Sequence, residues 1–312
     1  ENLAVCDKFN TYIAGNLETD AKTLVKEAYY TWPYHTEEFV NLLEWMKAYN
    51  ATKSQEEQIK LWGVDIQFAY QSIRLLADKL HSINNSINLK IPDVPRQEHF
   101  MYRATDSTLA SIDSLVSGMG NSNHDRTYLA RHLEAVIMKN GYSSKQRDGM
   151  YGTEASSRYR DSCMAVNAAR ILNHIGKDDK MMVWAHNAHV AKSFNTAVLK
   201  APMGAFLNEL IPDSIYSIGF DYNQGELLLH VPNKGFSPVT IKPRDNHDLA
   251  RLLDEVDYQL LYIPLNPQRV NQAQLSLPVQ MRKEHMLVKA SYTALYDGLF
   301  FVNRVSATTP LK

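Results

Sequence analysis

Residues 181–190 read MMVWAHNAHV, and the interpretation of the chain starts from this stretch. Its first five residues are an apolar run that is too short for a helix, so they predict a buried strand over 181–185. Two imidazoles and an amide, from His186, Asn187 and His189, follow directly. Ligands of open α/β sheets bind beyond the carboxyl ends of the strands, and histidine exchanges protons near neutral pH. The stretch therefore predicts an acid–base pair, unless one imidazole caps the next turn and the other packs.

Flanking segments repeat an alternation of helix and strand. A long helix is expected over 153–175, ended by Gly176 before the strand at 181–185. Upstream, the apolar run 59–66 precedes helical periodicity from Gln67 to Leu80, which indicates a β-then-α unit. The alternation predicts an α/β fold with a mostly parallel sheet.

The C-terminal third changes pattern. Residues 214–222 and 226–231 flank the turn signal Asn223-Gln224-Gly225, so we expect a hairpin that forms an antiparallel edge of the sheet. Further strands are expected over 236–242, 258–264 and 299–305, with a helix over 246–255. Near the N-terminus, Thr36 is expected to cap an amphipathic helix that carries Phe39, Leu42, Leu43 and Met46 on one face.

Composition narrows the function classes. The chain has 312 residues and a formal net charge of −1, which offers no broad electrostatic field for nucleic acid. Its two cysteines, Cys6 and Cys163, form no zinc-like cluster. No apolar stretch approaches the ~20 residues of a membrane span, and the sequence shows no signal peptide. A cytoplasmic location is expected, or a periplasmic or secreted one if a signal peptide was removed upstream. The sequence does not indicate an oligomeric state.

Two charged residues are candidates for chemistry away from the histidines. Arg160 shares a helix face with Met164 and Asn167, and it could clamp an anion or stabilise an oxyanion. A structural ion pair between Arg160 and the adjacent Asp161 is an equally good interpretation. Asp65, at the end of the run 59–66, could orient a histidine, although capping of the helix that begins at Gln67 is favoured.

Metal and serine-nucleophile chemistry are less favoured. His186 and His189 are three residues apart, whereas helical zinc sites use a spacing of four with a third ligand downstream. The chain has no Gly-x-Ser-x-Gly motif, and Gly118-Met119-Gly120 precedes no P-loop lysine. We therefore expect no metal and no cofactor.

Several motifs, taken together, resemble the erythromycin esterase-like hydrolase family in order and spacing. The motifs are Trp184–Val190, Arg160-Asp161 with Met164-Ala165 and Asn167, Gly63–Gln67, Thr36-Glu37-Glu38 with Leu43-Glu44-Trp45, Met203-Gly204, Asp297-Gly298 and Thr309–Leu311. The resemblance spans almost the entire chain and implies one domain over 1–312, with a helical subdomain at about 68–150.

This resemblance implies a three-layer α/β/α fold with additional helical insertions. It also implies metal-independent hydrolysis of an ester or lactone, with macrolides such as erythromycin among the substrates, by water that a histidine activates. Carried over by position, His186, His189 and Glu1 would be catalytic together with Arg160, and Asn187, Asn167 and Asp65 would bind substrate.

One family motif is missing from the sequence. The family's first strand ends in Gly-Glu-x-x-His-Gly, whose histidine is the expected general base, and Glu1 resembles the acidic residue that ends the second strand. The chain is therefore expected to be N-terminally truncated, and loss of a general base costs ~10²–10⁴-fold in rate. The competing hypothesis is a non-catalytic protein that retains the family cleft and binds a small molecule.

Overall fold

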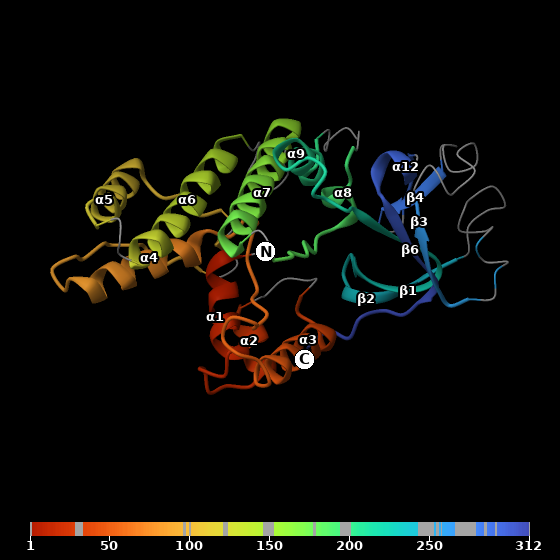
Figure 1. The fold of residues 1–312 in the computed structure, drawn as a ribbon, viewed down its shortest axis with the longest axis horizontal. Coiled ribbons are helices and arrows are strands. Elements are labelled where there is room, and N and C mark those ends of the chain that lie inside the picture. The colour runs from red at the N-terminus through yellow and green to blue at the C-terminus, as the bar shows by residue number, and fades with distance from the viewer. Residues whose placement is uncertain are drawn as a thin grey trace. The chain divides into compact units, whose positions relative to one another are not determined.

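The computed structural model describes most of the chain. The described residues are 2–28, 34–95, 98–99, 101–120, 124–145, 153–176, 179–193, 201–242, 253, 256, 258–265, 279–283, 286–290 and 292–311. Contacts divide the chain into two compact units, Glu1–Asn167 with Pro310–Lys312 (unit 1) and Ala168–Thr309 (unit 2). Figure 1 shows that helices make up unit 1 and that the sheets belong to unit 2.

The N-terminal part of unit 1 is a cluster of three helices, α1 (Leu3–Ile13), α2 (Ala21–Ala28) and α3 (Glu37–Asn50). Their apolar faces bury one hydrophobic cluster, with Phe9 and Leu43 at its centre. The predicted start of α3 is confirmed, because the Thr36 side chain accepts a hydrogen bond from the Phe39 N–H. The helix face with Phe39, Leu43 and Met46 is buried, as its spacing predicts.

A second cluster joins α4 (Tyr70–Ile83), α5 (Asp106–Ser117) and α6 (His124–Lys145), which pack around Ile73, Ile112 and Leu133. These helices lie within the range expected for the helical subdomain; that subdomain stays a prediction. The expected long helix is confirmed as α7 (Glu154–Ile175), and it ends at Gly176 with a φ of 116°.

The expected strand over 59–66 is wrong. The segment is extended, but its one sheet-like contact is an isolated parallel bridge between Asp65 and Asn2. Side-chain amides take the place of a neighbouring strand: Asn10 bonds to both backbone groups of Leu61, and Asn50 does the same at Ile59. The helices of unit 1 therefore satisfy this backbone without a ladder.

Unit 2 contains a four-stranded sheet in the order β2-β1-β6-β3. Its strands are β1 (Ile218–Val231), β2 (Gly235–Ile241), β3 (Leu260–Pro264) and β6 (Gly298–Val305). β1 and β6 are parallel, whereas the pairings of β1 with β2 and of β3 with β6 are antiparallel. The strands expected over 236–242, 258–264 and 299–305 are thereby confirmed.

A separate antiparallel pair joins β4 (Val279–Lys283) and β5 (Met286–Ala290). Unit 2 also contains the short helices α8 (Asn187–Val190), α9 (Met203–Leu210) and α12 (Tyr292–Leu295). The helix expected over 246–255 lies almost entirely outside the described residues.

The predicted hairpin turn at Asn223-Gln224-Gly225 is wrong, because these residues lie inside the continuous strand β1. Gly225 has a φ of 129°, and a Cβ there would collide with the backbone of Val305 on β6. The glycine therefore permits a close approach of two strands. The chain reverses instead at 232–234, where Asn233 has a positive φ of 63°.

The buried strand expected over 181–185 is also wrong. These residues are extended without a sheet partner, and Met182 and Trp184 are 91% and 65% exposed. The fold is a mixed α/β fold with antiparallel sheet edges and many added helices. The described strands do not form the expected mostly parallel sheet, and the three-layer arrangement stays a prediction. None of the helices in the described ranges is long and apolar enough to cross a membrane.

Candidate functional site

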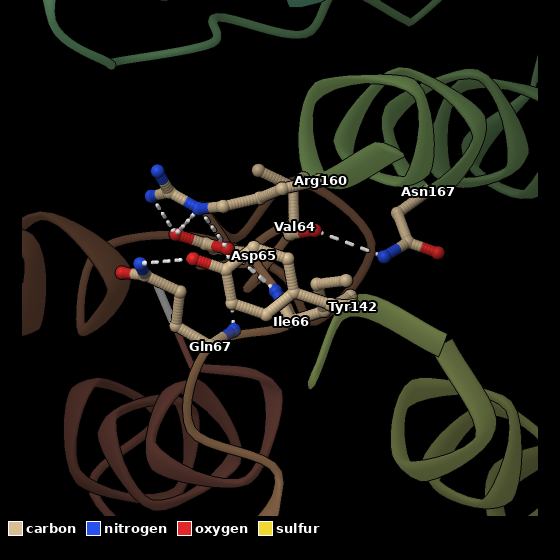
Figure 2. A network of polar contacts seen from close by, with 7 residues as sticks. All are labelled: Val64, Asp65, Ile66, Gln67, Tyr142, Arg160 and Asn167. Carbon is tan, nitrogen blue, oxygen red and sulfur yellow. Dashed lines mark hydrogen bonds and ion pairs between the residues drawn. The ribbon is translucent and has the colours of Figure 1, made fainter. Parts of the chain in front are cut away.

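Asp65 and Arg160 form the central ion pair of unit 1, shown in Figure 2. Arg160 Nε lies 2.9 Å and 3.1 Å from the two carboxylate oxygens of Asp65, and Nη2 donates a second bond to Oδ2. Asp65 Oδ1 also accepts the backbone N–H groups of Ile66, at 2.7 Å, and Gln67, at 3.2 Å. The carboxylate is therefore held by a guanidinium fork and by its own turn.

This arrangement identifies the carboxylate that pairs with Arg160. The expected pairing of Arg160 with Asp161 is wrong: the ion-pair partner is Asp65, which is far away in sequence. Asp65 holds the turn at Ile66 and Gln67, as a capping residue would, although α4 begins only at Tyr70. The sequence suggested Asp161 as the partner of Arg160 because the two residues are adjacent. A contact between residues that are far apart in the chain cannot be seen in the sequence.

Electrostatics keep Arg160 charged. Burial would lower the pKa of its guanidinium, but the Asp65 carboxylate, by charge and by hydrogen bonding, raises it above its ordinary value. Asp161 and Tyr142 act in the same direction. Arg160 is therefore a permanent cation that could face a negatively charged group, with 18% of its side chain exposed.

Asn167 ties α7 to the same segment. Its Nδ2 donates a hydrogen bond of 2.9 Å to the backbone carbonyl of Val64, next to Asp65 (Figure 2). The amide N–H of Asn167 therefore has a structural partner, and a substrate-binding role for Asn167 stays a prediction. Arg160 and Asn167 lie two turns apart on α7 and hold adjacent residues of one loop, so they position that loop together.

Lys139, on α6, is a member of this neighbourhood that sequence reasoning missed. It is buried, and its ammonium lies 5.0 Å from the centroid of the Tyr142 ring. Burial lowers its pKa to about 8, against the opposing effect of Asp65. A lysine in the middle of a helix usually lies on a solvated face, so the pattern gave no reason to single it out.

In unit 2, the geometry defines the proton position on His186. Its Nδ1 accepts the N–H of Ala188 at 3.1 Å, so His186 caps α8. A neutral imidazole whose Nδ1 accepts carries its proton on Nε2. The interpretation in which one histidine caps the next turn is therefore correct for His186, which presents an N–H donor.

Asn187 and His189 follow on α8. The Asn187 amide pairs with the backbone of Phe220 on β1, donating at 2.5 Å and accepting at 3.0 Å, so it fixes α8 to the sheet. The ring centroids of His186 and His189 lie 6.5 Å apart, and both rings are within one short helix and its cap. The two imidazoles lie close together, as expected. The side-chain amide of Asn187, in contrast, is hydrogen-bonded to the backbone of β1.

The expected catalytic residue Glu1 lies outside the described residues. Within the described ranges, no group of three or more histidine, cysteine or acidic side chains could hold a metal ion. The absence of a metal stays a prediction for the chain as a whole.

A Ser-His-Asp contact also occurs in unit 1. His132 Nδ1 lies 3.2 Å from Ser72 Oγ, and Nε2 lies 3.0 Å from Asp7 Oδ2. Ser72 and His132 are each 1% exposed, so no substrate carbonyl can reach the hydroxyl. The contact joins α1, α4 and α6 and is structural. Wide separation in sequence hides it from pattern analysis.

Comparison with solved structures establishes the fold. The chain superposes over 100% of its length on a succinoglycan biosynthesis protein (TM-score 0.71, 18% identity, 80% of that chain). It also superposes over 100% of its length on a Bacillus cereus protein (TM-score 0.75, 17% identity, 81% of that chain). A mutant of the erythromycin esterase EreC in its open conformation matches 99% of the chain (TM-score 0.62, 17% identity, 81% of that chain). These identities indicate a shared fold and no more.

Sequence comparison adds the family. A putative hydrolase of Bacillus subtilis (strain 168), YbfO, is 25% identical over 167 residues, which cover 49% of this chain. The match spans about a third of that relative, 36% of its length. The profile of the family described as "Erythromycin esterase" matches residues 1–305. The chain therefore belongs to the erythromycin esterase family.

Proposed function

We propose that the protein is a hydrolase that cleaves an ester or lactone with water activated by a histidine and without a metal. The observation that carries the proposal is the family match across residues 1–305, and the hydrolase name of the Bacillus subtilis relative supports it. Macrolide lactones such as erythromycin are the candidate substrates that the family description suggests.

The geometry of α8 suggests different tasks for the two histidines. His186 accepts at Nδ1, so its Nε2–H is a donor suited to a carbonyl oxygen that gains negative charge. A neutral histidine in this tautomer has no second acceptor nitrogen, so it is a poor general base. His189 is therefore our candidate for the base that takes a proton from water in this unit.

Arg160 is proposed as an anion-binding residue in unit 1. Asp65 fixes the orientation of the Arg160 guanidinium and keeps it charged. The exposed portion of the Arg160 side chain is available to a negatively charged ligand. We assign Asp65 and Asn167 to positioning, because Asp65 holds Arg160 and Asn167 holds the adjacent carbonyl of Val64.

The alternative is a protein that binds a small molecule without turnover. The specific observation in its favour is that Asn187 and the Nδ1 atom of His186 serve the local structure. A cleft that is retained for binding would keep the same contacts.

Turnover of chromogenic acyl esters, simple lactones and erythromycin by the full-length protein tests the proposal. Hydrolysis of one class that is lost in His189→Gln supports it. Binding of a macrolide by calorimetry with no product by mass spectrometry would favour the alternative.

A further inference from the structure

Three aromatic side chains form a row across one face of the four-stranded sheet in unit 2. Phe220 on β1 pairs with Phe300 on β6, and Phe300 pairs with Tyr262 on β3, so the three residues lie side by side on neighbouring strands. The ring centroids are 5.3 Å apart between Phe220 and Phe300, and 5.0 Å apart between Phe300 and Tyr262. We call these three residues the aromatic row.

The aromatic row is open to solvent, although the opposite face of the same sheet is buried. Phe220 is 58% exposed and Tyr262 is 45% exposed. Leu299 and Phe301, which flank Phe300 on β6 and point to the other face, are fully buried. Single exposed apolar side chains are ordinary, whereas a contiguous exposed group of large ones marks a binding surface. A ligand can therefore reach the row.

The rings are held in place in the absence of any ligand. The Tyr262 ring lies against Gly298, where an added Cβ would come within 2.8 Å of the ring. The Tyr262 hydroxyl pairs with the hydroxyl of Tyr216 at 2.6 Å. The rings of Phe220 and Phe300 stack on each other, with an angle of 24° between their planes. A surface that is already ordered loses little conformational entropy when it binds a ligand.

The polar atoms at the Tyr262 end are already used. The Tyr216 hydroxyl donates to the backbone carbonyl of Asp297 at 3.0 Å, so Tyr262 is the donor in the hydroxyl pair. Both hydroxyl hydrogens therefore have acceptors, and both phenols are neutral at pH 7. A sugar ring would need free donors and acceptors, so the row is complementary to a hydrocarbon chain.

The Phe220 end of the row lies next to α8. β2 pairs with β1 only from Gly225 onward, so Phe220 is in the part of β1 that β2 does not cover. There the side chain of Asn187 bonds to both backbone groups of Phe220. His186 directly precedes Asn187 and caps α8. A chain that lies along the row therefore has one end beside the histidines.

We propose that the aromatic row binds the aliphatic chain of a linear ester, with the ester group at the α8 end. The inference rests on the proposed function for the position of the ester group, and among esters and lactones it selects a linear ester. Strands about 4.8 Å apart give three rings enough length for a chain of several carbons. Full burial of a methylene strengthens binding about fourfold, and the row covers one side of the chain, so we expect about twofold for each methylene.

Binding can be measured without turnover, by using N-methyl amides of acetic, butyric, hexanoic and octanoic acid as ester analogues. The probe is nuclear magnetic resonance of the full-length protein with ¹³C-labelled phenylalanine rings. The signals of Phe220 and Phe300 are assigned by their loss in Phe220→Leu and Phe300→Leu. We expect the amides to shift both signals, with a Kd that falls about twofold for each added methylene. Methyl glucoside should leave both signals unchanged.

A pair of variants tests whether the row itself is responsible. Phe300→Ala removes the middle ring and should abolish the dependence of Kd on chain length. Phe236→Ala removes a ring of similar exposure, 45%, from β2 and should leave Kd unchanged. Measurements on the wild-type protein alone can overturn the proposal: unmoved Phe220 and Phe300 signals, a Kd independent of chain length, or equal shifts with methyl glucoside. Signals that shift with protein concentration instead would assign the row to a second copy of the chain and would also overturn it.

Turnover of p-nitrophenyl esters from acetate to octanoate separates this proposal from the proposed function. The value of kcat/KM should rise with chain length in the wild type and stay level in Phe300→Ala. Amide binding that depends on chain length, in a protein that hydrolyses no ester, would retain the row and reject the hydrolase. Ester hydrolysis that neither chain length nor Phe300→Ala affects would retain the hydrolase and reject the row.

Discussion

Arg160 donates from two nitrogens to the carboxylate of Asp65, and the pair joins α7 to the loop before α4. Only 3% of the Asp65 side chain is exposed, so removal of its partner leaves a buried charge uncompensated. We predict that Arg160→Ala lowers the free energy of unfolding by about 3–5 kcal/mol, measured by urea denaturation. Arg160→Lys keeps the charge but loses the planar fork, so it should lie between Arg160→Ala and the wild type.

The double variant Asp65→Asn/Arg160→Met is the control for that prediction. The double variant has no unpaired buried charge at this site. Its free energy of unfolding should therefore be closer to that of the wild type than to that of Arg160→Ala. If the double variant is as stable as the wild type but turns over ~10²-fold more slowly, Arg160 acts on the reaction as an anion-stabilising group. An Arg160→Ala protein of normal stability would contradict the structural part of this argument.

The two histidines of α8 should respond differently to substitution. His189→Gln removes the candidate base and should lower kcat by ~10²–10⁴-fold. His186→Asn keeps an N-cap acceptor for the Ala188 N–H but removes the Nε2–H donor, so kcat should fall by ~10²–10³-fold with an unchanged Tm. A His186→Asn protein with a lower Tm and normal kcat would show that His186 serves as a cap alone.

The rate of hydrolysis should rise with pH on the acid side. A general base acts only when it is neutral, and histidine side chains ordinarily lose their proton near pH ~6.5. We therefore expect kcat/KM to increase from pH 5 to pH 7, and the increase to be absent from the residual activity of His189→Gln. An activity that is flat over this range would exclude a histidine base.

The hydrolysis should need no metal. Dialysis of the full-length protein against a strong chelator, followed by a turnover assay, should leave kcat unchanged, because the three-residue spacing of His186 and His189 does not match that of a helical zinc site. Loss of activity that zinc or manganese restores would contradict the prediction.

Local sequence signals predicted the helices well. These signals act within a few residues, so a short sequence window contains all the information needed. Examples are the capping threonine and the apolar spacing of α3, and the glycine that ends α7. The partner of Arg160 could not be found in this way. Asp65 and Asp161 are equivalent as charges, and only the packing of α7 on the loop before α4 selects Asp65.

The strands were harder to predict for a related reason. A short apolar run such as 181–185 becomes a strand only if another strand pairs with it, and the run itself does not contain that information. Gly225 shows the same limit, because a glycine needed for contact with Val305 has the same pattern as a turn glycine. The closeness of His186 and His189 follows from their spacing in the sequence, whereas the burial of Lys139 depends on tertiary packing.

Burial of Lys139 should cost stability in a way that depends on pH. Its pKa is about 8 in the folded protein and near 10.5, its ordinary value, in the unfolded chain. Between these values the unfolded chain binds more protons than the folded protein, so stability due to this group rises with pH. Below pH 8 both states are protonated, and the full cost of a buried ammonium is present.

We therefore predict that Lys139→Met raises Tm at pH 7. The advantage of the variant should shrink as the pH is raised from 8 towards 10.5, because the wild-type lysine becomes neutral in its buried site. Lys145→Met removes the same charge from an exposed position of the same helix and should leave Tm nearly unchanged at both pH values. Calorimetry of the three proteins at pH 7 and pH 10 measures the difference. A Tm gain that is equal at the two pH values would mean that the side chain's apolar packing, and not its buried charge, sets the cost.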